Sequence, residues 1–363
     1  MGVRLCEFES RLRHQEIQGP ALIRAGPFQL DEGGSMGEWT AGRLLGVSGG
    51  YWQAFALHAA VKMDVFSQVG DEGVGEKDLA ARIACDPRAL GMLLNALTAM
   101  GLLAKKGPRY HNTTASKSLL VRTSPQYVGH MIMHHHHLVQ PWYYLDEAVK
   151  RGGPVEGARL PEKERRESFL MGMFNTAMAT APGLAKDVDL KGRKHLLDLG
   201  GGPGTYAIHF CRENRELKAT VFDLPTTEPF ARKTIERFGV SDRVDFVPGN
   251  FIKDEIPGSY DVAWLSHILH GEGPADCQAI VDKAAQVLEP GGLCLIHDFI
   301  LNNQFDGPLF PTLFSLNMLV NTEQGQSYSE AKIREMMEKA GIRNLRRLPF
   351  EGPTQSGVII GEA

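Results

Sequence analysis

The chain has 363 residues, which is too long for one ordinary domain and predicts two or three. Its 43 % hydrophobic and 23 % charged residues are typical of a globular protein and exclude a disordered chain. The 39 basic and 43 acidic residues leave a net charge of −4, which argues against a surface built for nucleic acid or anionic membrane.

The five cysteines are scattered and form no CxxC pair, which argues against a disulfide framework and a structural zinc site. The most apolar stretch, residues 89–104, is shorter than the roughly 20 apolar residues that span a bilayer. No apolar segment of a secretory signal is visible near the N-terminus. We therefore expect a cytoplasmic protein that does not enter a membrane.

Residues 1–37 have mixed charge and no sustained period, and are expected to be a flexible tail. Residues 38–123 follow as a first domain. Apolar spacing predicts helices over 51–67, 76–84 and 87–100, the last begun by Asp86-Pro87. Two short extended runs around Gly107-Pro108 come next, and three helices with such a hairpin indicate a winged helix.

Residues 124–189 are expected to be connecting helices. Ser124-Pro125 predicts the start of one, and residues 150–190 are expected to be helical with breaks at proline and glycine.

Residues 190–363 alternate strand and helix, which predicts an α/β domain with a parallel sheet covered on both faces. The expected strands are 195–199, 219–223, 243–247, 260–265 and 292–297, with a helix over 276–288. A helix capped by Ser329 then runs to Gly341. It precedes two runs, 344–350 and 356–361, that must pair antiparallel because the loop between them is short.

The glycines of 200–204 lie where the first strand of this domain ends and a helix begins, so backbone amides there favour a negatively charged or closely approaching ligand. Asp223 ends the next strand, 19 residues after Gly204, near the spacing at which an acid holds a ribose. Asp198 precedes the glycines and would repel a pyrophosphate but bind an ammonium group. These features favour S-adenosylmethionine over NAD, and a purely structural turn is the alternative.

Several motifs together resemble the plant-type (caffeate and hydroxyindole-type) class I S-adenosylmethionine-dependent O-methyltransferases. They are LLDLGGGPG at 196–204, FDLP at 222–225, VPGNF at 247–251, SHILH at 266–270 and EPGG at 289–292. The resemblance covers roughly residues 40–363. It implies a Rossmann-like seven-stranded sheet with its last strand antiparallel, and an N-terminal winged-helix domain that forms a homodimer.

The resemblance also implies a cofactor site for S-adenosylmethionine. Its residues would be Asp198, Gly200, Gly202, Asp223, Leu224, Asn250, Phe251 and Ser266. Leu224 would pack on the adenine. The family usually has an acid where this chain has Asn250.

His270 matches the family's general base, which takes a proton from the acceptor hydroxyl, a role that suits an imidazole. Asp298 matches the carboxylate that orients it, and Glu272 is a further candidate catalytic carboxylate. His267 is the competing histidine, and a helix-capping role is the alternative for either ring.

The chain also departs from the family around the base: Gly271 stands where the family has Asp, Glu272 follows where it has Trp, and the second orienting acid falls on Ser327. The same fold with a weakened base can carry out other S-adenosylmethionine chemistry, such as decarboxylation or hydroxylation. That remains the alternative to O-methylation.

The acceptor site implied by the resemblance consists of His134, Trp142, Phe174, Met178 and Met318. Aromatic and methionine side chains favour an aromatic or polycyclic hydroxylated small molecule, although such a stripe is also typical of core. His130, His134 and His137 have the spacing of one helix face, but no cysteine supports a metal there and none is expected.

A winged helix also raises DNA binding as an alternative. The helix that would enter the groove, 87–100, carries Arg88 as its one basic residue. Because a recognition helix needs polar and cationic side chains, we expect this one to be buried and no nucleic-acid partner.

Overall fold

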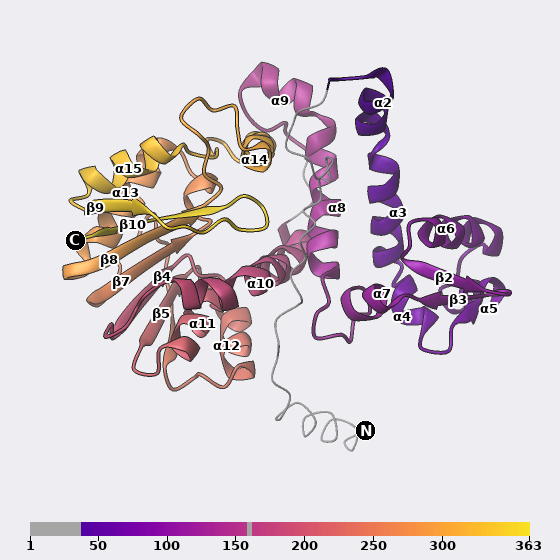
Figure 1. Ribbon diagram of the computed structural model, residues 1–363, viewed down its shortest axis with the longest axis horizontal. Helices are drawn as coiled ribbons and strands as arrows, with labels where there is room; N and C mark the ends of the chain where they lie inside the picture. The colour runs from indigo at the N-terminus through magenta and orange to yellow at the C-terminus, as the bar shows by residue number, and fades with distance from the viewer. Residues whose placement is uncertain (1–37, 158–161) are drawn as a thin grey trace.

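The computed structural model describes residues 38–157 and 162–363. The tail expected over residues 1–37 lies outside the described residues. A small helical unit at the N-terminus and a larger α/β unit lie at opposite ends of the molecule, with long helices between them (Figure 1).

The N-terminal unit packs helices around a three-stranded sheet of order β1-β3-β2. Its elements are α2 (Ala41–Gly49), α3 (Tyr51–Lys62), α4 (Val65–Val69), β1 (Val74–Gly75), α5 (Glu76–Arg82), α6 (Pro87–Ala99), β2 (Leu103–Lys106), β3 (Arg109–Asn112) and α7 (Thr114–Leu119). The helix expected over 51–67 is broken in two, because Asp64 adopts a left-handed conformation with φ of 56°. Helix α6 buries Leu90, Leu94 and Leu97 in the core of this unit.

The connecting helices are α8 (Gly129–Tyr143), α9 (Leu145–Arg151) and α10 (Glu162–Asp187). Helix α8 begins at Gly129 rather than at Ser124-Pro125, so that prediction was wrong. The Ser124 hydroxyl donates to the Ser118 carbonyl in a turn instead of capping a helix. Pro182 lies inside α10 without ending it, since α10 packs along α8 and α11.

The C-terminal unit contains a seven-stranded sheet of order β6-β5-β4-β7-β8-β10-β9. The strands are β4 (His195–Leu199), β5 (Lys218–Asp223), β6 (Val244–Pro248), β7 (Tyr260–Ser266), β8 (Leu288–Asp298), β9 (Arg343–Arg347) and β10 (Gly357–Glu362). The pairs among β4 to β8 are parallel, whereas β10 runs antiparallel to both β8 and β9. The strand positions therefore agree with those expected from the sequence to within a few residues.

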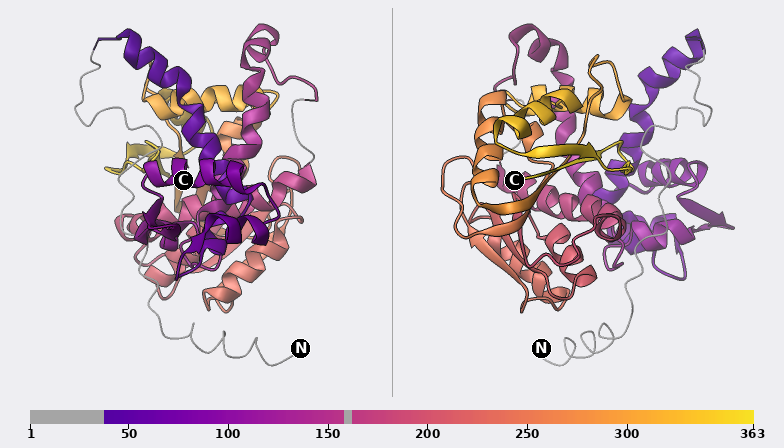
Figure 2. Two further views of the ribbon diagram at one scale, coloured as in Figure 1. Left: turned by 90° about the vertical axis from the view of Figure 1, so that its right-hand side faces the viewer. Right: turned by 60° about the vertical axis from the view of Figure 1, so that its left-hand side comes forward.

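Helices cover both faces of this sheet (Figure 2). On one face lie α10, α11 (Thr205–Glu213) and α12 (Glu228–Arg237), and on the other lie α13 (Pro274–Gln286) and α15 (Glu330–Lys339). A hydrophobic core lies on each face of the sheet, and successive residues of β8 alternate between them. Leu293 and Leu295 pack into the core under α10, α11 and α12, whereas Cys294 and Ile296 pack into the core under α13 and α15. The short helix η1 (Leu269–Gly271) follows β7, and α14 (Leu309–Asn321), which the sequence did not predict, follows β8 and contacts α8 and α9.

Among the described residues, none of the helices is long and apolar enough to cross a membrane.

Candidate functional site

The glycine loop joins β4 to α11 through three left-handed glycines, Gly200, Gly202 and Gly204, with φ of 66°, 54° and 77°. Gly200 is also sterically confined, because a Cβ there would lie 2.5 Å from Cγ2 of Ile268. Phe251 is the next neighbour, at 3.4 Å. Glycine is therefore needed at position 200 both for the backbone angle and for the space.

Asp198 is fully buried at the end of β4, behind this loop. Its Oδ2 accepts a hydrogen bond of 3.1 Å from the Ala207 amide, but its Oδ1 has no partner. Burial raises the pKa of Asp198 to about 7, and the nearby Asp223 carboxylate adds to the rise. A buried carboxylate oxygen without a partner is suited to a cationic ligand.

Asp223 is held at the end of β5 by three donors. Its Oδ2 accepts from the Gly202 amide at 2.8 Å, and its Oδ1 accepts from the Leu224 amide at 2.6 Å and the Thr227 hydroxyl at 3.2 Å. Burial raises the pKa of Asp223, and the hydrogen bonds from Gly202 and Leu224 oppose the rise. Asp223 thus ties the glycine loop to β5, and Thr227 was not expected at this site from the sequence.

The other residues expected at the cofactor lie around the same edge of the sheet. Asn250 uses its side-chain oxygen locally, accepting from the Ile252 amide at 2.9 Å and the Lys253 amide at 3.2 Å. Phe251 is half-buried beside Gly200, and Leu224 is exposed.

Ser266, at the end of β7, hydrogen-bonds through Oγ to Nδ1 of His297 at 3.0 Å. Nε2 of His297 bonds in turn to the Ser356 hydroxyl at 2.9 Å. Burial lowers the pKa of His297 well below its ordinary value, so its ring is neutral. His297 was not expected here, although it directly precedes Asp298 at the strand end.

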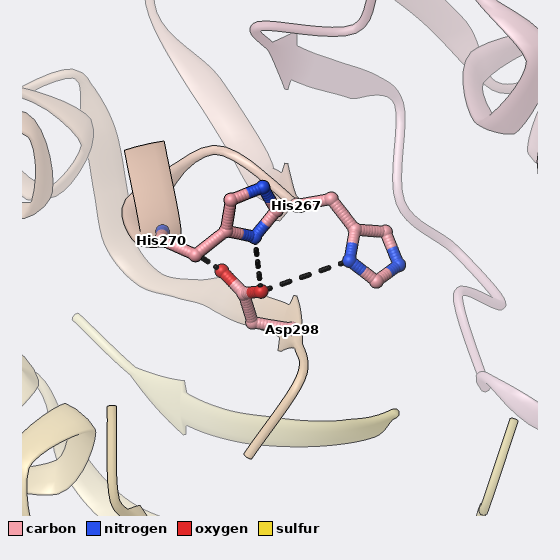
Figure 3. A group of neighbouring side chains, drawn as sticks. All are labelled: His267, His270 and Asp298. Carbon is pink, nitrogen blue, oxygen red and sulfur yellow. Dashed lines mark hydrogen bonds and ion pairs between the residues drawn. The ribbon is translucent and has the colours of Figure 1, made fainter. Parts of the chain in front are cut away.

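His270 and Asp298 form a close pair just beyond β7 and β8 (Figure 3). Nδ1 of His270 lies 2.6 Å from Oδ1 of Asp298, and the His270 amide donates to Oδ2 at 3.4 Å. Burial alone would raise the pKa of Asp298, but the histidines beside it outweigh burial and hold that pKa below its ordinary value. An ionised Asp298 only accepts, so Nδ1 of His270 carries a proton, and in the neutral tautomer with this arrangement Nε2 has the lone pair.

His267 is the second histidine next to Asp298 (Figure 3), with Nδ1 3.6 Å from Oδ1. That distance is too long for a hydrogen bond, and this buried nitrogen has no hydrogen-bond partner. Its backbone is left-handed, with φ of 57°. Burial lowers the pKa of His267.

Ser327, the position of the second orienting acid, uses its side chain in a bond to α14. It is 2 % exposed, its hydroxyl donates to the Pro311 carbonyl at 2.9 Å, and its amide donates to the Ser315 hydroxyl at 2.9 Å. Glu272 contributes its backbone carbonyl to a 2.6 Å hydrogen bond from the Tyr328 hydroxyl. Burial raises the pKa of the Glu272 carboxyl, and Asp276 adds to the rise.

The residues expected to bind the acceptor do not all lie together: some contact α14, and others lie along α10 and α8. Trp142 donates through Nε1 to Oδ1 of Asn317 at 2.8 Å, next to the buried Met318, and so joins α8 to α14. Phe174 instead packs against Phe238 with ring centroids 6.4 Å apart.

The rest of the expected acceptor set lies on α8 and α10. The sulfur of Met178 lies 3.4 Å from Nε2 of His209, and the His134 ring packs edge-on against Phe169, 5.4 Å between centroids. Neither contact reaches His270. Phe299, Phe310 and Phe314, which the sequence did not single out, form an aromatic group beside it, with Phe314 4.8 Å from its ring.

The histidines of α8 make separate contacts. His137 bonds through Nδ1 to the Ser168 hydroxyl at 3.0 Å, and the His136 ring packs against His58. Three side chains that could together ligate a metal ion come close to one another at a different place in the described residues, and they are His267, His270 and Asp298.

The site therefore fits a nucleoside with a cationic end. The unpartnered Asp198 oxygen would meet the cation, and the glycine loop presents backbone without side chains of its own to an approaching ligand. Comparison with known proteins identifies the nucleoside. Residues 142–343 match the model of the O-methyltransferase domain, and residues 45–122 match that of the O-methyltransferase dimerisation domain. The chain belongs to the O-methyltransferase family.

Similar proteins cover nearly the whole chain. The 3-hydroxy-5-methyl-1-naphthoate 3-O-methyltransferase of Streptomyces sahachiroi is 31 % identical over 88 % of this chain and 94 % of its own. The tetracenomycin polyketide synthesis 8-O-methyl transferase TcmO of Streptomyces glaucescens is 31 % identical over 86 % of this chain and 94 % of its own. The structure of PigF with SAH has a TM-score of 0.82 at 28 % identity, covering 90 % of this chain and all of PigF.

Human N-acetylserotonin methyltransferase in complex with SAM has a TM-score of 0.80 at 25 % identity, covering 90 % of this chain and 99 % of its own. This O-methyltransferase therefore uses S-adenosylmethionine, and the expected fold, enzyme class and cofactor are confirmed. Family membership also decides the open choice between an enzyme and a DNA-binding protein in favour of the enzyme.

Proposed function

We propose that this O-methyltransferase methylates a hydroxyl group on an aromatic, polycyclic small molecule, with His270 as the general base. The observation that carries the proposal is the 2.6 Å contact between Nδ1 of His270 and Oδ1 of Asp298. That contact fixes the tautomer in which Nε2 can accept a proton.

S-adenosylmethionine, when bound, supplies an electrophilic methyl group on a sulfonium centre. Asp198 would hold its ammonium group, Asp223 its ribose, and Gly200, Gly202 and Ser266 the chain between them. Nε2 of His270 takes the proton of the acceptor hydroxyl as its oxygen becomes a nucleophile. Asp298 stabilises the imidazolium that results, because its carboxylate already accepts the Nδ1 proton.

The aromatic acceptor class is supported by the surroundings of His270. Phe299 lies stacked at 5.7 Å from the His270 ring, and Phe314 lies edge-on at 4.8 Å. Flat rings pack well against such side chains. One similar protein is a methyltransferase of a hydroxylated naphthoate, which is a fused aromatic compound, and another is an 8-O-methyl transferase of tetracenomycin polyketide synthesis.

The working form that we propose is a homodimer in the cytoplasm, without a nucleic-acid partner. None of the residues of α2 is buried, and large apolar side chains of α2 and α3 such as Leu45 and Trp52 are exposed. A helix in that condition needs a partner surface. The four cysteines of the described residues are unpaired thiols, as expected in a reducing compartment.

His270→Ala is the test of the base. We expect turnover to fall by about 10²- to 10⁴-fold, because the hydroxyl proton loses its acceptor, while the affinity for S-adenosylmethionine changes little. Release of S-adenosylhomocysteine, measured over a panel of phenolic and polycyclic acceptors, gives the rate, and calorimetry gives the affinity. Unchanged turnover in the variant would remove His270 as the base.

A further inference from the structure

We propose that His267, His270 and Asp298 form a binding site for a divalent transition-metal ion, Zn²⁺ in particular, and that the bound ion blocks methyl transfer. The metal site stands on its own geometry. The inhibitory effect rests on the proposed function, in which His270 is the base.

The three side chains already converge on one point (Figure 3). One ligating atom from each lies within 4.8 Å of the others. The ligands of a tetrahedral zinc ion, at bonds of about 2.1 Å, lie about 3.4 Å apart. The 3.6 Å between His267 Nδ1 and Asp298 Oδ1 fits that spacing, and the 2.6 Å between His270 Nδ1 and Asp298 Oδ1 must widen by less than about 1 Å.

His267 supplies the second, independent observation. Its Nδ1 is buried without a hydrogen-bond partner and faces a carboxylate. The ring is held there between His297, with centroids 4.3 Å apart, and Phe299, 4.5 Å apart. The backbone stays in a strained left-handed conformation with its amide bonded to the His297 carbonyl at 2.8 Å. Strain of this kind concentrates at functional positions.

The donor set selects the class of ion. Two imidazole nitrogens and one carboxylate oxygen suit Zn²⁺ and its neighbours in the first transition row, whereas Mg²⁺ and Ca²⁺ prefer oxygen alone. Three protein ligands leave a fourth position for water.

Binding has a direct consequence for His270. The hydrogen bond to Asp298 places the proton of the neutral His270 ring on Nδ1, and a metal ion at Nδ1 requires that proton to sit on Nε2 instead. Nε2 then becomes a donor without a lone pair for the acceptor proton. The ion therefore stops the proton transfer and leaves the cofactor residues Asp198 and Asp223 untouched.

Binding is tested first with cobalt(II), whose visible absorption reports four-coordinate nitrogen and oxygen ligation, on metal-free enzyme without acceptor. We expect one Co²⁺ per chain in this form, displaced by Zn²⁺. His267→Asn, which tolerates the left-handed backbone, should weaken this binding at least tenfold. His136→Asn is the matched control, since it removes one histidine of the α8 run and leaves the three ligands in place.

Activity is tested second, as the fraction of each variant's own rate that remains at increasing Zn²⁺. Zinc should inhibit the wild type and His136→Asn alike, should require at least tenfold higher concentration for His267→Asn, and should leave the affinity for S-adenosylhomocysteine unchanged. His267→Phe, which keeps an aromatic ring between His297 and Phe299, repeats the test if the Asn variant misfolds. Equal cobalt binding or equal zinc sensitivity with and without His267 would overturn the proposal. The cobalt result stands whether or not His270 is the base.

Discussion

At the scale of single residues, Asp198 carries the clearest conflict between burial and charge. It is fully buried, one of its oxygens has no partner, and burial raises its pKa to about 7. An acid whose pKa is raised on folding destabilises the folded state as pH rises from its unfolded value near 4 towards 7. The protein without cofactor therefore bears this cost at neutral pH, and a bound ammonium group would relieve it.

Asp198→Asn should consequently stabilise the protein without cofactor at pH 8, by up to about 4 kcal/mol, and change little at about pH 3, where the carboxyl is largely protonated in both states. The same variant should bind S-adenosylmethionine at least tenfold more weakly. Thermal unfolding at the two pH values and calorimetric titration measure the two effects. A variant that is destabilised at pH 8, or that binds the cofactor normally, would contradict the role given to Asp198.

Ser327 gives the second prediction at this scale. Replacement by Glu, an acidic residue at the position of the second orienting acid, should not increase turnover, because the buried hydroxyl there is bonded to the Pro311 carbonyl and little space is left for a longer side chain. It should destabilise the protein by about 2–3 kcal/mol through burial of a carboxylate. Urea unfolding and S-adenosylhomocysteine release provide the measurements, with Ser327→Ala as the control for the lost hydrogen bond. Faster turnover in the Glu variant would show that the second acid can be restored.

The candidate site residues that the sequence pointed to, among them Asp198, Asp223 and His270, belong to contiguous motifs, and their roles stay predictions. The sequence did not predict Thr227, His297 or Phe314, because their contacts with the site depend on how separate strands and helices are brought together.

At the scale of elements, the junction of β4 and α11 depends on what surrounds each glycine. Gly200 and Gly202 are both left-handed, but a Cβ at Gly200 would meet Ile268 at 2.5 Å, whereas nothing lies within 4 Å of a Cβ at Gly202. A substitution at Gly202 therefore measures the free-energy cost of the left-handed backbone alone. A substitution at Gly200 adds the cost of the clash with Ile268.

Gly202→Ala should cost about 1 kcal/mol of unfolding free energy, and Gly200→Ala about 1–3 kcal/mol more. Adding Ile268→Ala should recover part of the stability in the Gly200 variant and none in the Gly202 variant. Chemical denaturation of the single and double variants supplies the numbers. Equal costs at both glycines would mean that Ile268 moves aside freely.

Element boundaries were harder to predict than element types. Ser124-Pro125 has the residue types that begin a helix, yet the Ser124 hydroxyl bonds to Ser118 and α8 starts at Gly129. Local propensity there gives way to a turn fixed by contacts with α7. The strands of the sheet were predicted closely because their apolar runs are bounded by glycine, proline and charge.

At the scale of the whole molecule, α2 and α3 project from the N-terminal unit (Figure 1). Several of their large apolar side chains are exposed. Leu45 is 73 % exposed and Trp52 is 71 % exposed. A monomer rarely leaves so much contiguous apolar surface in water.

The double substitution Leu45→Glu and Trp52→Glu should convert a dimer into a monomer, since charges in the buried centre of an interface cost several kcal/mol. Light scattering after size-exclusion chromatography measures the mass. Phe305→Glu, at an exposed apolar residue in the loop before α14, is the matched control and should leave the mass unchanged. A wild-type monomer at micromolar concentration would refute the proposed dimer.

The strand order β8-β10-β9 has a consequence for the order of folding. Because β10 lies between β8 and β9, those two strands never pair with each other, and β8 keeps one unpaired edge until residues 357–362 insert. That edge belongs to the strand that carries His297 and Asp298. A folding intermediate that lacks β10 would therefore expose a template for intermolecular strand pairing and hold an unfinished active site. Chaperone binding to newly made chains would be most useful during this interval.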